Sequence, residues 1–334
     1  MSLLGEPVVS ASDKITAWAV TTGEAGMRTQ ARGVALAVAD VVVEKTVALR
    51  APWNWFPAAL APNALAGLSA DSDRLAPPWP DLMISCGRRS AALSIAVRKA
   101  SNGRTLTVHI QDPRSSLAAF DLVVVMDHDP TPATANVLKT PTALHDLTAE
   151  NLAAAADAWR PRFASLGRPL VGVAIGGPTR RHPFSQAQAA RLIGCLRNLR
   201  QAGAGLAITP SRRTPPRIRA MLEAAFGGDD RVFLWDRSGA NPYRGILALA
   251  DRLVVTSESV SMVSEAIFTP HPVEVFDVGS RRHEGFLDAL IARGLVRRFT
   301  GEASPPMTSG PADSPPLVAA AVKGLLQSRT AMRG

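Results

Sequence analysis

Cysteine is scarce in this sequence of 334 residues, which contains only Cys86 and Cys195, far apart in the chain. Two isolated thiols cannot form a disulfide framework and lack metal-site spacing, so we expect a reducing, cytoplasmic compartment and no metal. Both cysteines are expected to be small buried residues. Neither a run of 18 apolar residues nor a secretory signal pattern occurs, so the sequence predicts no transmembrane helix and no signal peptide.

Aromatic residues make up 5% of the chain, with a single tyrosine, whereas the net charge is +9. The charge favours an anionic partner. Proteins that stack on bases usually expose several aromatic side chains, so nucleic acid is not expected as the partner. The remaining anionic partners are a nucleotide phosphate and an anionic membrane surface. The second would place the protein peripherally on the inner face of a membrane.

Apolar runs of strand length alternate with helical patterns along the whole chain, which predicts an α/β fold with parallel sheets. The length favours two domains. A segment rich in proline and arginine at 161–169 is the expected linker. The sequence therefore predicts two Rossmann-like domains facing a cleft, at 15–160 and 168–300. Residues 1–14 are expected to be a disordered leader, and 301–334 a flexible tail with a terminal helix.

The stretch 253–280 is the main candidate for a ligand site because hydroxyl and carboxylate side chains follow the apolar run Leu253–Val255. This pattern indicates a strand, a polar turn and the start of a helix, where α/β sheets bind ligands. Serine and glutamate are also ordinary residues at a helix start, so simple capping is the alternative. Four residues of this stretch are candidate nucleotide ligands: Ser259, Ser261, Ser264 and Glu265.

Two earlier strand ends in the second half carry glycine or arginine. Gly176 and Gly177 follow one predicted strand, with Arg180 close behind, and Ser211, Arg212 and Arg213 follow the next. Glycines let a backbone approach a phosphate, and arginines bind diphosphates through charge-assisted hydrogen bonds. An ionised Glu265 suits the two hydroxyls of a ribose. Together these residues predict a nucleotide-diphosphate pocket.

The first half offers candidates for a catalytic base. Glu24 lies in a glycine-containing turn after the first predicted strand, and Asp127 and His128 follow a later one. A histidine flanked by carboxylates can act as a general base, although a structural turn explains the same pattern. The aromatic segment 50–57 either covers the core or forms a lid, an acceptor platform or a membrane-interface patch.

Several motifs resemble the mitochondrial-fission ELM-type family. They are Gly-Gly-Pro at 176–178, Thr-Pro-Ser-Arg-Arg-Thr at 209–214, Asn-Pro-Tyr at 241–243 and Val-Thr-Ser-Glu-Ser-Val-Ser-Met-Val-Ser-Glu-Ala at 255–266. The resemblance covers about residues 15–300. More distantly, the second half is similar to the donor domain of GT-B glycosyltransferases. That similarity implies that Ser264 and Glu265 hold a ribose and that Gly176 and Gly177 face the diphosphate. Met27 stands where those enzymes have a histidine.

The residues and the resemblance lead to two hypotheses. The first is a protein that binds a nucleotide-diphosphate sugar and acts as a metal-independent glycosyltransferase without a cofactor, because arginines and helix dipoles supply the positive charge. The alternative is a non-catalytic, membrane-associated scaffold, because the family's eukaryotic members are implied to recruit a division GTPase to an organelle. A sugar-nucleotide epimerase is disfavoured because Tyr243 has no lysine four residues later.

Overall fold

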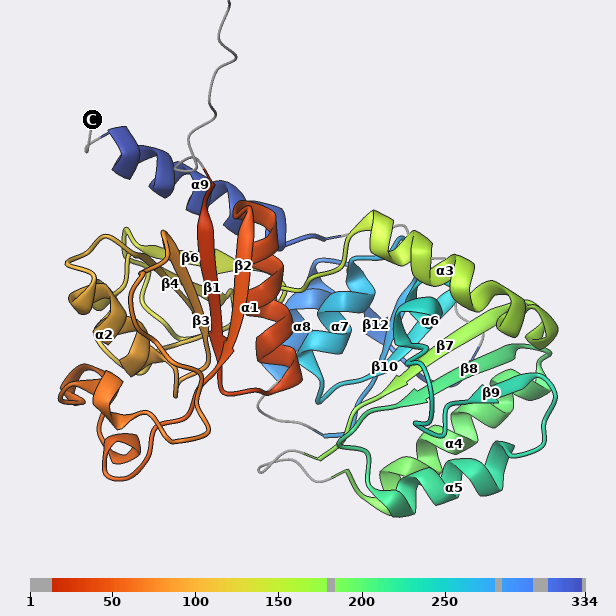
Figure 1. Cartoon of the computed structure of the whole chain (residues 1–334). Coiled ribbons are helices and arrows are strands. Elements are labelled where there is room, and N and C mark those ends of the chain that lie inside the picture. The colour runs from red at the N-terminus through yellow and green to blue at the C-terminus, as the bar shows by residue number, and fades with distance from the viewer. Residues whose placement is uncertain (1–13, 179–183, 280–283, 303–311, 332–334) are drawn as a thin grey trace, which may run out of the picture. The chain divides into compact units, whose positions relative to one another are not determined.

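The computed structural model describes residues 14–178, 184–279, 284–302 and 312–331, and the chain divides into two compact units. The first unit contains the chain up to Thr140, residues 144–146, and the chain from Pro315 onward. The second contains residues 141–143 and 147–314. Each unit is built on one six-stranded sheet, and every strand pairing is parallel (Figure 1). The predicted α/β class with two Rossmann-like halves is confirmed.

The sheet of the first unit has the strand order β2-β1-β3-β4-β5-β6. Its central strands are apolar and fully buried, as is usual for parallel strands that are covered by other elements on both faces. The strands are β1 (Thr16–Thr21), β2 (Val41–Thr46), β3 (Leu82–Cys86), β4 (Leu106–Ile110), β5 (Leu122–Met126) and β6 (Val137–Thr140).

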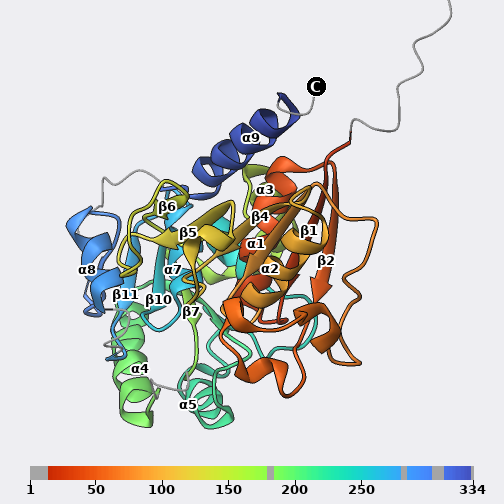
Figure 2. The ribbon, with the colours of Figure 1, turned by 90° about the vertical axis from the view of Figure 1, so that its left-hand side faces the viewer.

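Side chains alternate between the two faces of this sheet and form two separate apolar clusters. One face, which includes Ala19 and Ile84, packs against helices α1 (Ala25–Val38) and α9 (Pro315–Ala331). The other, which includes Trp18 and Met83, packs against α2 (Ala91–Ala100). The views show α1 and α2 on opposite sides of the sheet, and α9 against α1 (Figure 1, Figure 2).

The sheet of the second unit has the order β12-β11-β10-β7-β8-β9. Counted from the start of this unit, the order is 3-2-1-4-5-6, which is that of dinucleotide-binding Rossmann domains. The strands are β7 (Leu170–Ile175), β8 (Gly205–Pro210), β9 (Val232–Leu234), β10 (Arg252–Thr256), β11 (Val273–Phe276) and β12 (Arg297–Arg298).

Helices cover the second sheet as well. Helices α4 (Gln186–Gln201) and α5 (Pro216–Phe226) lie side by side on the face that carries Val173 and Ile208 (Figure 1, Figure 2). Ser185 caps α4 through a capping box with Gln188, as its sequence predicts. The remaining helices are α3 (Ala149–Phe163), α6 (Tyr243–Leu249), α7 (Val260–Ile267) and α8 (Glu284–Ala292).

The boundaries of the units differ from the expected domains. Helix α3 belongs to the second unit, not to a domain ending at 160, because Trp159 packs edge-on against Phe233 and contacts Gly245 closely. Residues 315–334 belong to the first unit because Val318 and Val322 enter its core. The terminal helix is confirmed as α9, whereas the expected leader 1–14 lies almost wholly outside the described residues.

The aromatic segment after β2 is only partly folded onto the core. Trp53 lies against Gly67 and donates a hydrogen bond from Nε1 to the carbonyl of Pro62. Trp55 is 77% exposed, Phe56 44% and Leu60 69%. Covering of the core, the first of the alternatives for this segment, does not hold for Trp55, whereas Trp53 is half-buried against Gly67. Among the described residues no helix is long and apolar enough to cross a bilayer.

Candidate functional site

The strand order of the second unit marks one place on its sheet where a ligand can enter. From β7 the chain proceeds to β8 on one side, and from β10 it proceeds to β11 on the other. The loops at the carboxyl ends of β7 and β10 therefore diverge, which leaves a crevice between them in folds of this kind. These loops begin at Gly176 and Ser257.

A chain of hydrogen bonds joins the two loops. The N–H of Gly176 donates to Thr256 Oγ1 over 2.8 Å, and Thr256 Oγ1 donates to Glu258 Oε1 over 3.0 Å. Glu258 is 3% exposed, and its Oε2 has no hydrogen-bond partner among the described residues. Burial raises the pKa of the Glu258 carboxyl to about 7, against the opposing effects of Arg213 and the N–H of Gly177. Glu258 therefore titrates near neutrality.

The two glycines after β7 are required by close packing. A Cβ at Gly176 would lie 2.3 Å from Glu258 Oε1. A Cβ at Gly177 would lie 2.3 Å from the backbone carbon of Arg213 and 2.7 Å from the amide nitrogen of Thr214. That these glycines let the backbone approach a phosphate remains a prediction. The lack of space for a Cβ is a separate reason for glycine at both positions.

The loop after β8 lies against the loop after β7. Ser211 donates its N–H to the carbonyl of Ile175, and Thr214 Oγ1 donates to the carbonyl of Gly176. Arg212 and Arg213 are exposed on this loop. Arg213 acts electrostatically on Glu258, so a positive charge lies close to the buried carboxyl. Arg180, the remaining arginine of the predicted pocket, lies outside the described residues.

The predicted ligands on α7 have different surroundings. Ser259 precedes the helix without a side-chain capping bond, and Ser261 is half-buried. Ser264 is fully buried, and its Oγ accepts a hydrogen bond from the N–H of Ala143. Glu265 is 8% exposed and accepts a 2.6 Å hydrogen bond from the hydroxyl of Tyr243. Burial and this carboxylate raise the pKa of Tyr243. Simple capping is thus insufficient to explain the cluster.

The candidate bases of the first unit do not form one group. Glu24 is exposed at the start of α1 and accepts a hydrogen bond from Thr22 Oγ1, whereas Asp127 and His128 follow β5. Because β3 and β4 lie between β1 and β5, three strand spacings of about 4.8 Å separate the two loops by roughly 14 Å. The side chain of Asp129 accepts the N–H of Met126 within a turn. Each base remains a separate prediction.

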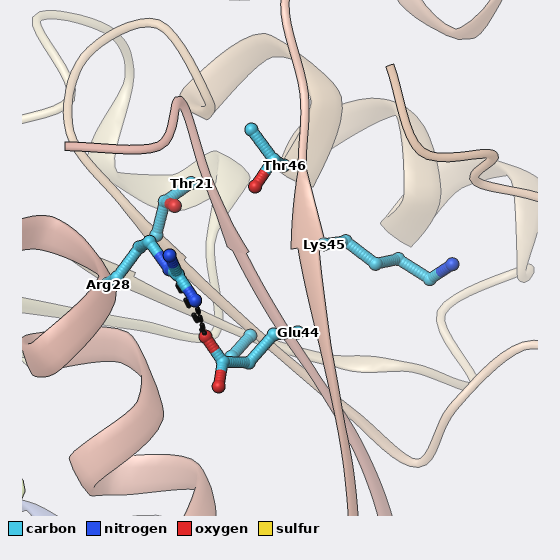
Figure 3. A pocket seen from close by; sticks show the side chains of 6 residues that line it. Thr21, Arg28, Glu44, Lys45 and Thr46 are labelled. Carbon is cyan, nitrogen blue, oxygen red and sulfur yellow. Dashed lines mark hydrogen bonds and ion pairs between the residues drawn. The ribbon is translucent and has the colours of Figure 1, made fainter. Parts of the chain in front are cut away.

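A small cavity in the first unit proved not to match the predicted pocket. Its volume is about 10 Å³, enough for about one water molecule. It is lined by Thr21, Arg28, Glu44, Lys45 and Thr46, with Ala19 behind them. Figure 3 shows Arg28 paired with Glu44, 3.0 Å apart, and Lys45 directed away from the pair. The pair satisfies its own charge, so we assign no ligand to this cavity.

Sequence reasoning missed two residues as functional candidates. Glu258 belongs to the hydroxyl-rich stretch, but it was not separated from residues suited to helix capping, because its burial depends on Gly176 from another loop. The sequence relates Tyr243 only to the Tyr–Lys pair of epimerases, whereas in the structure its hydroxyl donates a hydrogen bond to Glu265. No local signal separates Glu258 from an ordinary residue of a helix start, because its neighbour Gly176 lies 82 positions earlier in the chain.

The fold and the polar strand ends define a class: two Rossmann-like units of the GT-B type. One solved structure shares this fold, and a second is a weaker match. A Listeria monocytogenes structure named after the UDP-N-acetylglucosamine 2-epimerases matches with a TM-score of 0.57 and 13% identity, covering 94% of this chain and 97% of that one. The Acinetobacter baumannii MurG structure matches with a TM-score of 0.47 and 12% identity, over 93% and 90% of the two chains.

The model of the family Mitochondrial fission ELM1 matches residues 25–326, so this chain belongs to that family, as its motifs predict. The Mitochondrial fission protein ELM1 of Arabidopsis thaliana is 33% identical over 246 residues, covering 66% of this chain. The chain spans 58% of the length of that relative. A Rickettsia prowazekii protein, RP120, is 25% identical over 258 residues, covering 66% of this chain and 72% of its own length.

Proposed function

We propose that the second unit binds a nucleotide-diphosphate sugar at the carboxyl ends of β7, β8 and β10, and that the protein is a metal-independent glycosyltransferase. The observation that supports this most directly is the convergence of three features at one sheet edge. They are exposed arginines after β8, a buried carboxyl after β10 with one oxygen that lacks a partner among the described residues, and the amino end of α7. Helix amino ends and guanidinium groups both stabilise phosphate.

In this proposal each loop has its own task. Arg212 and Arg213 neutralise the charge that develops on the leaving diphosphate when the bond between the sugar and its phosphate oxygen breaks. Glu265, held by Tyr243, binds the ribose hydroxyls. The acceptor hydroxyl forms the new bond to the sugar and gives its proton to Glu24, Asp127 or His128.

Binding is tested by isothermal titration calorimetry with a panel of nucleoside diphosphates and their sugar conjugates. We expect one of them to bind, and Arg213→Ala to weaken binding by about tenfold or more, since a charge-assisted contact contributes about 1.5–3 kcal/mol. Arg197→Ala is the matched control, because Arg197 is exposed on α4. Absence of binding by every compound, or equal effects of the two substitutions, would contradict the proposal.

The reaction is tested separately from binding. Release of nucleoside diphosphate that depends on an added acceptor supports transfer, whereas conversion of a sugar nucleotide to its epimer without acceptor supports an epimerase. Epimerisation is tested because the Listeria structure is named after epimerases, although this sequence lacks the Tyr–Lys pair. Substitutions Glu24→Gln, Asp127→Asn and His128→Asn identify the base if one of them abolishes turnover and leaves binding unchanged.

The alternative function, a membrane-associated scaffold, is favoured by one observation. Trp55, Phe56 and Leu60 expose large apolar surfaces within six residues, and segment 47–70 contains Arg50 and no acidic residue. Trp and Phe prefer the membrane interface, and the net charge of +9 suits an anionic bilayer. The family name also refers to an event at a membrane.

Sedimentation with vesicles of phosphatidylcholine and phosphatidylglycerol tests this alternative. We expect binding that weakens with salt and is lost in the double variant Trp55→Ala, Phe56→Ala. Leu36→Ala is the control, because Leu36 is 52% exposed on α1, away from the aromatic segment in sequence. If the wild-type protein stays in the supernatant, or if Leu36→Ala has the same effect, the aromatic segment is not a membrane contact.

A further inference from the structure

The candidate site contains an apparent conflict. Arg213 and the amino end of α7 favour an anion, yet the carboxyl of Glu258 already occupies the space above Gly176. An ionised Glu258 would repel a phosphate, because like charges at contact distance in a poorly solvated site are strongly unfavourable. A neutral carboxylic acid would instead have a proton to donate.

The unused oxygen of Glu258 shows how this conflict is resolved. Oε1 is occupied by the hydroxyl of Thr256, which is itself held by the N–H of Gly176. Oε2 has no partner among the described residues, although the side chain is almost completely buried. A buried polar atom without a partner costs free energy unless a ligand satisfies it. A proton on Oε2 would be ready to bond a phosphate oxygen.

We propose that Glu258 binds the ligand as a neutral carboxylic acid, donating a hydrogen bond from Oε2 to a phosphate oxygen, so that one proton is taken up with each ligand. The inference rests on the proposed function and specifies how the same site recognises a diphosphate. No bond is made or broken in this step. The proton comes from solvent and returns to it when the ligand leaves.

The charges around Glu258 are consistent with this assignment. Arg213 faces it from the loop after β8, and the loop after β7 offers only backbone N–H groups among its described residues. Near β11, Asp277 accepts a hydrogen bond from Ser257 and pairs with Arg298. Because the pKa of Glu258 is about 7 without ligand, a bound phosphate raises it further, and proton uptake becomes measurable above neutral pH.

Calorimetry of the full chain in two buffers with different heats of ionisation measures the protons taken up. UDP-N-acetylglucosamine, ADP-glucose and GDP-mannose are used as probes, because each of their phosphates carries one ester and one anhydride bond and does not titrate between pH 6 and 8.5. For a probe that binds, we expect uptake of about 0.5–1 proton at pH 8 and affinity that falls up to about tenfold per pH unit above pH 7. Below pH 6 both effects should vanish.

Glu258→Gln keeps the shape and an N–H donor but cannot titrate, so it should bind with an affinity that is independent of pH and without proton uptake. Glu223→Gln, exposed on α5, is the control and should behave as wild type. Binding without proton uptake by the wild type, or uptake that persists in Glu258→Gln, overturns this inference and leaves the proposed function standing. If no probe or nucleoside diphosphate binds at any pH, the proposed function itself fails.

Discussion

The two units use the same architecture but differ at the edge where ligands bind. In the first unit the strand order reverses between β1 and β3, and in the second between β7 and β10. After β3, a Cβ at Gly87 would meet the side chain of Met27, and Ser90 Oγ donates to the carbonyls of Cys86 and Gly87. After β10, Oε2 of the buried Glu258 has no hydrogen-bond partner in the part of the chain that the structure describes.

The strand order of each sheet creates a possible ligand site at one edge. The side chains at that edge determine whether a ligand can bind there. At the edge of the first sheet, Ser90 is satisfied by local carbonyls and Glu24 is exposed. At the edge of the second sheet, Thr256 and Glu258 are buried and joined to Gly176 across two loops, and among the described residues Oε2 of Glu258 has no hydrogen-bond partner. Burying a polar atom without a hydrogen-bond partner costs free energy, and such atoms are candidates for a functional role.

The largest expected difference is between one buried ion pair of the second unit and one exposed ion pair of the first. Glu274, with no exposed surface, pairs with Arg252 and Arg297 of the neighbouring strands, whereas the Glu44–Arg28 pair is 37% and 53% exposed. Glu274→Ala leaves two cations without their partner and should lower the free energy of unfolding by about 3–5 kcal/mol. Glu44→Ala should lower it by at most about 1 kcal/mol. Urea unfolding measures the free energy of unfolding of both variants. Equal losses would show that the buried ion pair is not more important for stability than the exposed one.

The pH dependence of stability should have opposite signs for one buried residue of each unit, His109 and Glu258. Burial lowers the pKa of His109 in the first unit from 6.5 to about 3. Between these two pH values the unfolded chain binds a proton at this residue and the folded unit does not. Its stabilising contribution is present above pH 6.5 and falls with acidification, by about 2 kcal/mol at pH 5. His109→Asn should reduce this loss, as measured by urea unfolding at pH 5 and 7.5.

Glu258 acts in the other direction. Its pKa rises from 4.5 to about 7 on folding, so its contribution is fully present below pH 4.5 and is lost as the pH rises to about 7. Glu258→Gln should therefore stabilise the ligand-free protein at pH 8, by up to about 3 kcal/mol, and have little effect at pH 4.5. An effect on stability that does not change with pH would show that folding does not raise the pKa of Glu258.

Two glycines of the second unit should respond to alanine in opposite directions. Gly177→Ala brings a Cβ against the backbone of Arg213 and should cost about 1–3 kcal/mol and reduce nucleotide affinity. Gly194→Ala, in the middle of α4 with open space around it, should stabilise by about 0.5–1 kcal/mol. Thermal unfolding and calorimetry compare the two. Unchanged stability in Gly177→Ala would mean that the loop after β8 can move away from the loop after β7.

The sequence by itself determined the elements and much of their chemistry. The apolar runs of β7 and β10, the capping box at Ser185 and the terminal helix follow from local patterns, because hydrophobic periodicity and capping act over a few residues. The α/β class and the polar stretch after β10 could be predicted for the same reason, whereas the family was predicted from the resemblance of its motifs.

Only the tertiary structure decided which of these elements meet. It joined α3 to the second unit through Trp159 and Phe233, and α9 to the first through Val318. It also placed β7 next to β10, so that Gly176, Thr256 and Glu258 share hydrogen bonds across 80 residues of chain. Burial, and with it the pKa of Glu258, depends on contacts between distant segments, which no local pattern contains.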